Sequence, residues 1–124
     1  MHRIIVSLAA NCHHKENLAE ARRRLGQILF NVHYTEELWT EPFGGRTPSM
    51  YLNQLVYATT SLSLEQLTET LKQTELDMGR NSEERRKGIV CIDLDLMLFD
   101  GVRHHLRDWE RPYIQALLKN DDDL

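Results

Sequence analysis

The sequence has little cysteine, no long apolar run and no excess of positive charge. Its two cysteines, Cys12 and Cys91, are too few for a disulfide framework and too far apart for a zinc-binding motif, so free thiols are expected. The apolar stretch at residues 4–10 is far shorter than the about 20 residues of a membrane span and lacks the flanks of a signal peptide. We therefore expect a cytoplasmic protein that does not bind a membrane.

The charge balance argues against nucleic acid as a general partner. The formal net charge is −4, whereas general nucleic-acid binders neutralise phosphates with a basic surface. With 41% apolar and 27% charged residues, the composition is that of a globular protein. A chain of 124 residues fits one domain, which we predict to span residues 1–124, with a core at about 3–100 and a short tail at 101–124. The oligomeric state stays open.

Four segments have the β-branched, apolar and aromatic composition of strands. The alternation of polar and apolar side chains falters in the second of them at Glu36-Glu37, where a bulge is expected. Asp100-Gly101 marks a turn after the last one. The predicted strands are residues 3–8, 31–41, 50–60 and 89–99.

Two longer segments have the period of helices. Residues 18–29 repeat apolar side chains every three or four positions, which leaves Arg22 to Arg24 mostly on the outer side. The second helix begins at Ser63, whose hydroxyl can form a capping box with Gln66, and ends at Gly79.

The remaining segments are predicted to be a loop and a tail. The charged residues 80–88 indicate a solvated loop, and residues 109–118 a short helix with Pro112 in its first turn. The element order is β-α-β-β-α-β plus a tail. This order is typical of an α+β, ferredoxin-like fold, in which a four-stranded antiparallel sheet carries two helices on one face. The other face would stay open for ligands.

Two aspartates lie inside the most strand-like run of the chain. Side chains alternate along a strand, so Asp93 and Asp95 share one face, roughly 7 Å apart, while Leu94 and Leu96 face the core. Mg²⁺ would remove the repulsion between these carboxylates, because it is commonly bound by one or two carboxylates together with phosphate oxygens. The alternative is that both aspartates only solvate the open face of an amphipathic sheet.

Further short motifs accompany this Asp-x-Asp pair. They are Thr40-Glu41-Pro42, Tyr51-Leu52-Asn53, and the Glu-x-x-x-Gly-Arg pattern of Glu75 to Arg80. In these motifs and their order, over about residues 3–100, the chain resembles the hydroxymethyl-dihydropterin pyrophosphokinases of folate biosynthesis. These enzymes transfer pyrophosphate from ATP to a pterin alcohol, and members have a ferredoxin-like core.

The resemblance implies a role for each matching residue. Asp93 and Asp95 would hold two Mg²⁺ ions and, with Arg80, form the catalytic set, while Lys72, Glu75 and Arg80 would lie on the ATP side. The pterin would rest near Thr40, Phe43, Tyr51 and Asn53. ATP and a pterin alcohol are thus the expected small-molecule partners.

Each of these residues also has a structural interpretation. Asn53 could cap a bulge, Tyr51 could pack on the sheet, and Arg80 could be a cation that meets a helix dipole. Outside the family context, these interpretations are favoured.

The chain also departs from the family pattern. Ala9-Ala10-Asn11 stands where the family has Gly-Ser-Asn, and Lys87-Gly88-Ile89-Val90 where it has Trp-Gly-Pro-Arg. Val90 thereby replaces a phosphate-binding arginine, and Tyr113 falls where a histidine is expected. A second hypothesis is therefore a degenerate relative that binds nucleotide, pterin or a protein partner without effective catalysis. A third is a module that uses the open sheet face for dimerisation.

Overall fold

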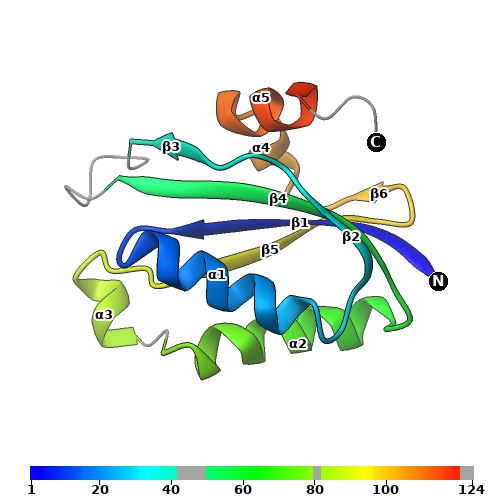
Figure 1. Cartoon of the computed structure of the whole chain (residues 1–124), viewed down its shortest axis with the longest axis horizontal. Helices are drawn as coiled ribbons and strands as arrows, with labels where there is room; N and C mark the ends of the chain where they lie inside the picture. Colours follow the sequence, from blue (N-terminus) through cyan, green and yellow to red (C-terminus); the bar gives the residue numbers. More distant parts are fainter. Residues whose placement is uncertain (42–49, 80–81, 121–124) are drawn as a thin grey trace.

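The computed structural model describes residues 1–41, 50–79 and 82–120. Its elements form a sheet with helices on both faces, as Figure 1 shows. The strands are β1 (His2–Ala10), β2 (Phe30–Tyr34), β3 (Leu38–Thr40), β4 (Tyr51–Thr60), β5 (Asp93–Phe99) and β6 (Val102–Arg103). The helices are α1 (His14–Leu25), α2 (Leu64–Asp77), α3 (Ser82–Arg86), α4 (Leu106–Trp109) and α5 (Pro112–Asn120). None of the helices so described is long and apolar enough to cross a membrane.

Over the residues that the structure describes, the sheet is antiparallel and has six strands, so the predicted four-stranded sheet is wrong. Its order is β2-β4-β1-β5-β6, and β3 pairs with β4 beyond the end of β2. The predicted turn is confirmed, because Asp100 and Gly101 both have positive φ, as a two-residue hairpin turn of type I′ requires. The hairpin adds β6, which sequence analysis missed because two residues carry no periodic pattern.

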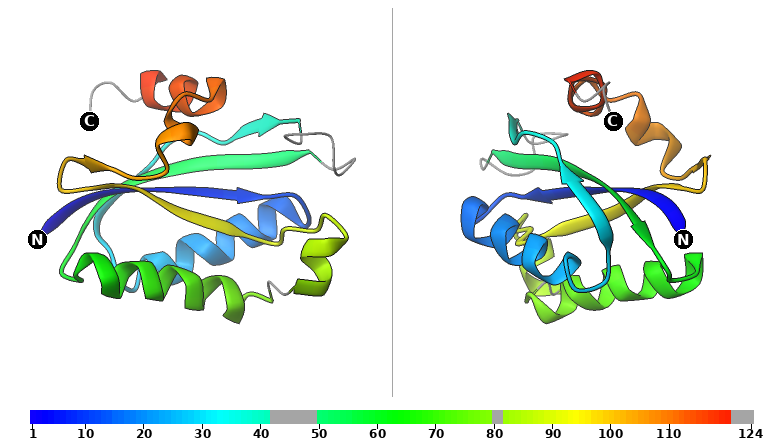
Figure 2. Two further views of the ribbon diagram at one scale, coloured as in Figure 1. Left: turned by 180° about the vertical axis from the view of Figure 1, so that it is seen from behind. Right: turned by 45° about the vertical axis from the view of Figure 1, so that its right-hand side comes forward.

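Two apolar clusters lie on opposite faces of the sheet. The larger is formed by α1, α2 and the side chains of β1, β4 and β5 that point toward them, among them Val6, Leu18 and Leu67. The smaller joins Ile5, Met97 and Trp109 to Ile114 and Leu117 of α5. Figure 2 shows α4 and α5 on the face opposite to α1 and α2. The two predicted helices do share one face, as α1 and α2. The prediction that the other face is open is wrong, because α4 and α5 pack on it.

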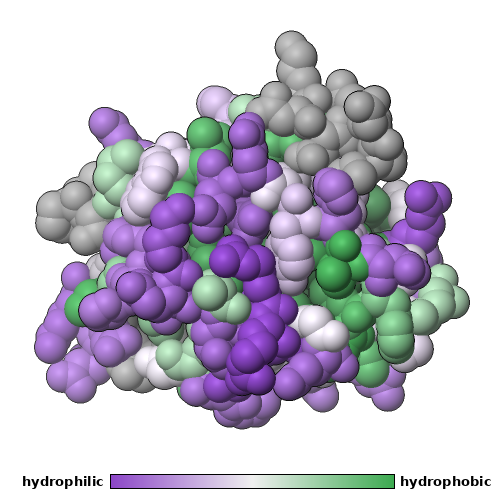
Figure 3. Space-filling view, viewed as in Figure 1, coloured by the Kyte–Doolittle hydropathy of each residue, from purple (hydrophilic) through white to green (hydrophobic). Residues whose placement is uncertain are grey.

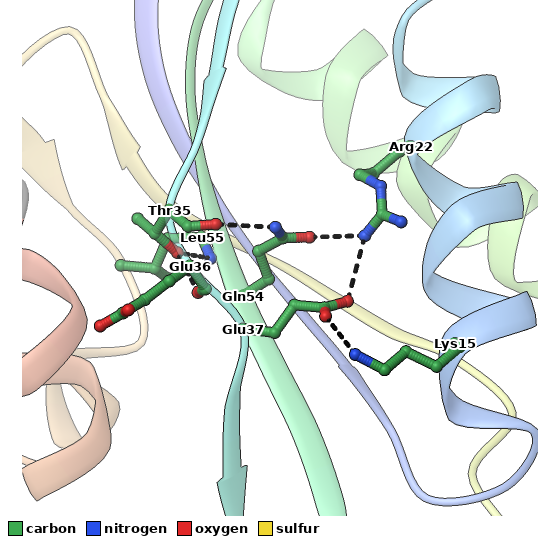
Figure 4. Close-up of polar contacts among 7 residues, drawn as sticks. All are labelled: Lys15, Arg22, Thr35, Glu36, Glu37, Gln54 and Leu55. Carbon is green, nitrogen blue, oxygen red and sulfur yellow. Dashed lines mark hydrogen bonds and ion pairs between the residues drawn. The ribbon is translucent and has the colours of Figure 1, made fainter.

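The predicted strand at residues 31–41 is interrupted by a buried threonine. Thr35 is 3% exposed, and its hydroxyl accepts a bond of 3.0 Å from the Leu55 N–H, in the place of a backbone carbonyl. The buried Gln54 side chain donates to the Thr35 carbonyl at 2.7 Å. Figure 4 shows how these bonds hold the segment between β2 and β3 against β4. The interruption falls at the predicted irregularity but divides the segment into two strands.

The same polar network reaches α1. Arg22 donates to the side-chain amide oxygen of Gln54 at 2.9 Å and lies 3.5 Å from Glu37, which also pairs with Lys15 at 2.6 Å. Arg22 is thus half-buried instead of on the outer side of the helix. Around it the outward surface of α1 is mostly hydrophilic, while apolar side chains gather over the edge strand β2 (Figure 3). Phe30 and Val32 of β2 are 50% and 42% exposed.

The second half of the chain differs from prediction in its polar segments. The predicted loop at 80–88 contains the helix α3, in which Glu83 and Glu84 occupy the first turn, where they suit the helix dipole. The last predicted strand begins at Asp93, four residues late. The tail helix is divided, and Pro112 opens α5, where its missing N–H costs nothing. The capping box of Ser63 and Gln66 on α2 is confirmed.

Replacing Trp109 should detach the tail helices from the sheet. Its indole N–H donates to the carbonyls of Met97 and His104 at 3.1 and 3.0 Å, and its ring is 6% exposed. We expect Trp109→Ala to lower the free energy of unfolding by about 3–5 kcal/mol, measured by urea denaturation. Leu106→Ala is the matched control, since Leu106 is 66% exposed and a surface truncation changes stability by about 0.5 kcal/mol at most. Equal effects of the two variants would contradict the assignment.

Candidate functional site

The two aspartates lie where strand β5 faces the tail helices. Asp93 pairs with Ala9 and Asp95 with Ser7 of β1. Both side chains are half-buried, while Leu94 and Leu96 are buried in the larger cluster on the opposite face. The predicted division of β5 into an apolar face and a carboxylate face is therefore confirmed.

A pocket of about 220 Å³ opens beside Asp93. It brings Asp93 together with three other residues predicted to form the site, Thr40 of β3 and Tyr51 and Asn53 of β4. Strand pairing explains this convergence, because β3 and β1 flank β4, with Thr40 opposite Tyr51 and Ala9 opposite Asn53. Among the described residues, the lining consists of Ala9, Thr40, Glu41, Tyr51, Asn53, Asp93, Arg111, Pro112 and Tyr113.

Asn53 is held in one orientation within this lining. Its side chain is 3% exposed, and its amide nitrogen donates to the Thr40 hydroxyl at 2.8 Å and to the Leu38 carbonyl at 3.0 Å. A buried amide that bridges two strands loses its rotational freedom when the protein folds, not when a ligand binds. Asn53 therefore has a structural role that is compatible with presenting a fixed polar edge to the pocket.

The tail contributes Arg111 and Tyr113, which sequence analysis did not include among the site residues. Burial raises the pKa of the Tyr113 phenol; Arg111 opposes this shift, and the carboxylates of Asp108, Asp95 and Asp93 add to it. Arg111 also pairs with Asp108, at 3.0 Å between Nε and Oδ1. The signal in the sequence was the Arg111-Pro112-Tyr113 triplet, whose proline places both neighbours at the start of a helix.

Of the residues predicted to bind ATP, the two that the structure describes, Lys72 and Glu75, do not line this pocket. The Glu75 carboxylate accepts a hydrogen bond of 2.7 Å from the backbone N–H of Leu94, between the two aspartates. Lys72 is exposed on α2. Arg80 and Phe43 lie outside the described residues.

Asn11, the residue retained from the family's first motif, connects β1 to the segment before β5. Its side chain donates to the Gly88 carbonyl at 2.7 Å and accepts from the Val90 N–H at 2.6 Å. Its own N–H donates to the Val90 carbonyl at 2.9 Å. These bonds fix the backbone that leads into Asp93. They hold Val90 through its backbone N–H and carbonyl, so its position does not depend on its side chain.

The donor set suits a metal that takes few protein ligands. Across residues 1–41, 50–79 and 82–120, no group of three or more His, Cys, Asp or Glu side chains gathers to hold a metal ion. Mg²⁺ keeps several waters and is bound through one or two carboxylates plus phosphate oxygens. Asp93 and Asp95, side by side on one face, fit that pattern. His105 lies 3.9 Å from Asp95 and completes the polar surroundings.

A second hollow, of about 690 Å³, lies farther along the same sheet face. Its lining includes Arg3, His33, Tyr57 and Asp100 but none of the predicted site residues that the structure describes. Asp93 lines the smaller pocket and does not line this hollow, so the smaller pocket is the better candidate.

Comparisons with known proteins agree with the motifs. The sequence model of the family described as 7,8-dihydro-6-hydroxymethylpterin-pyrophosphokinase (HPPK) matches residues 5–120. The chain is 28% identical to a folate synthesis bifunctional protein of Arabidopsis thaliana over 125 residues, which cover 93% of this chain and 26% of that protein.

Two mitochondrial folate synthesis bifunctional proteins are similar to the same degree. The chain is 29% identical to that of Pisum sativum, with 93% of this chain and 24% of that protein covered. It is 30% identical to a second one from Arabidopsis thaliana, with 94% and 23% covered. The chain thus spans about a quarter of the length of the curated relatives it matches. Because the family match extends over most of the chain, the chain belongs to the 7,8-dihydro-6-hydroxymethylpterin-pyrophosphokinase family.

Proposed function

We propose that this chain transfers pyrophosphate from Mg-ATP to the hydroxymethyl oxygen of a pterin alcohol, a step of folate biosynthesis. The observation that carries the proposal is the pocket beside β5, whose lining includes Asp93 together with Thr40, Tyr51 and Asn53. These residues come from three strands, and the family resemblance assigns them to metal and pterin binding. Family membership supports the reaction class.

The roles of the residues follow from their positions. Tyr51 and Tyr113 offer aromatic surface and Asn53 a fixed polar edge, which suits a flat, polar ring. The pocket of about 220 Å³ is smaller than the roughly 300–1,000 Å³ of sites for drug-sized ligands. It therefore suits the smaller of the two substrates, the pterin alcohol.

Asp93 and Asp95 would hold Mg²⁺ on the polyphosphate side of this pocket. When bound, Mg²⁺ neutralises charge on the phosphate oxygens during transfer. The chain's own contribution is to fix two carboxylates on one strand face and to bring the pterin hydroxyl close to them. Positioning of this kind supplies much of the rate enhancement in phosphoryl transfer.

A second candidate function is ligand binding without effective turnover. It is favoured by Val90, which stands where the family has a phosphate-binding arginine and whose backbone is tied to Asn11. An aliphatic side chain cannot clamp phosphate oxygens as a guanidinium does. Arg111 is a cation in the pocket lining, but it already pairs with Asp108.

We also infer a ferredoxin-like core within one domain. The strand order β5-β1-β4-β2, with α1 and α2 between consecutive strands of the chain, supports the arrangement. The membership of β1 residues in both apolar clusters supports a single folding unit.

The proposal is tested by calorimetric titration with a non-hydrolysable ATP analogue, with and without Mg²⁺ and the pterin alcohol, followed by an assay for AMP release from ATP. We expect Mg²⁺-dependent binding and AMP formation. Asp95→Asn removes a charged ligand, so it should weaken Mg²⁺-dependent binding by at least about 10- to 100-fold, the loss typical of outer-shell changes alone. Asp77→Asn, an exposed carboxylate on α2, is the matched control.

The outcomes separate the candidate functions. If the chain bound neither the nucleotide analogue nor the pterin alcohol, both ligand functions would be wrong. Binding of both ligands without AMP release would support the second candidate function, which is ligand binding without effective turnover.

The Tyr113 phenol should report the charge of the aspartate pair. The pKa of Tyr113 is raised first by burial and further by Asp108, Asp95 and Asp93. Removing a neighbouring negative charge favours the phenolate, so Asp93→Asn should lower the pKa of Tyr113 relative to the unaltered chain. Ultraviolet absorbance of phenolate during a pH titration measures this, with Tyr113→Phe assigning the signal. Glu65→Gln, at the exposed start of α2, should leave it unchanged.

A further inference from the structure

One backbone amide of β5 points away from the strand beside it. In an antiparallel pair, alternate residues direct their N–H groups toward and away from the partner. Leu94 lies opposite Leu8 of β1, yet its N–H donates to Glu75 of α2. In the described part of the chain, β6 pairs with β5 only at Leu98 and Phe99, so no strand covers this side of Leu94.

Glu75 supplies the missing acceptor from a well-anchored helix. Its Oε2 lies 2.7 Å from the Leu94 nitrogen, a short distance for a bond from a neutral donor to a carboxylate. α2 is fixed against the sheet by Leu67, Leu71 and Thr74, all buried. The carboxylate therefore joins a rigid helix to the peptide bond between Asp93 and Asp95.

We propose that Glu75 is a positioning residue that acts through the Leu94 amide to hold Asp93 and Asp95 at the separation and direction a divalent cation needs. The metal-binding part of this inference rests on the proposed function. The Leu94 side chain is 5% exposed in the larger cluster, so core packing and the Glu75 bond together restrain the residue between the two aspartates. An edge strand without such a partner frays and exchanges its amides more readily.

This role differs from direct binding of the nucleotide or the metal. A direct ligand of the metal needs the negative charge of the carboxylate. A positioning residue needs only an acceptor oxygen in the right place. Glutamine keeps that oxygen and loses the charge, whereas leucine loses both. The pair Glu75→Gln and Glu75→Leu therefore separates the two roles.

The experiment uses the full chain labelled with ¹⁵N and ¹³C. Hydrogen exchange of the Leu94 amide and the carboxyl carbon shifts of Asp93 and Asp95 are recorded without metal, and Mg²⁺ affinity is then measured by titration with Mg²⁺ alone. Glu69→Leu, an exposed glutamate on the same helix, is the matched control.

We expect Glu75→Leu to speed exchange of the Leu94 amide at least about tenfold, since a bond to a charged acceptor is lost. It should also shift both aspartate signals and weaken Mg²⁺ binding on the order of 10-fold. Glu75→Gln should keep the Leu94 amide protected and Mg²⁺ affinity within about twofold, a small change beside the 10- to 100-fold of a lost outer-shell contact. Glu69→Leu should change none of these quantities.

Two results would overturn the proposal. One is an unchanged Leu94 amide and unchanged aspartate signals in Glu75→Leu. The other is a loss of Mg²⁺ affinity in Glu75→Gln as large as in Glu75→Leu while the Leu94 amide stays protected, which would make Glu75 a direct ligand. If the unaltered chain bound no Mg²⁺, the proposed function would fail, but the exchange and shift measurements would still decide whether Glu75 holds the strand.

Discussion

Burial of β1 on both faces is the constraint on which the rest of the structure depends. Ile4, Val6 and Leu8 point into the cluster under α1 and α2, while Ile5 points into the cluster under α5. A strand that is apolar on both sides needs a layer on each. The two layers of helices, with β4 and β5 on either side of β1, satisfy this need.

The candidate site lies where the sheet face under α5 changes from apolar to polar side chains. Toward the end of β1 the side chain becomes small at Ala9, which lies opposite both Asn53 and Asp93. The tail helix covers the apolar part of the face and leaves Tyr113 at the border of the polar part. The site therefore lies where the packed apolar layer ends and the two carboxylates begin. Water is partly excluded there, so electrostatic interactions are stronger than in bulk solvent.

Sequence periodicity predicted the local features of the fold well. The capping box at Ser63 depends on neighbours three residues apart, and the shared face of Asp93 and Asp95 depends only on strand alternation. The double burial of β1 was also present in the sequence, as an apolar run without alternation from Ile4 to Val6. Such a run predicts a packed layer on each face of the sheet.

The missed features depend on distant partners. Thr35 interrupts the second predicted strand because its hydroxyl accepts a hydrogen bond from the Leu55 N–H. Leu55 lies 20 residues away, so a local sequence pattern does not predict this bond. Tyr113 joins the pocket because Trp109 docks the tail on Met97. The charged segment at 82–86 is helical through complementary charge, not through an apolar stripe. The role of Glu75 toward Leu94 likewise depends on a distant partner, since a motif specifies a residue type and not what that residue contacts.

The pocket's construction from Ala9, early in the chain, and Tyr113, late in it, has a consequence for folding. Contacts between distant positions form after local ones, because loop closure costs more entropy as the loop lengthens. During synthesis the chain must emerge well beyond the last strand before this cavity can close. A ligand that needs the closed cavity therefore cannot guide the early steps of folding. It would slow unfolding of the finished protein and leave the rate of folding unchanged.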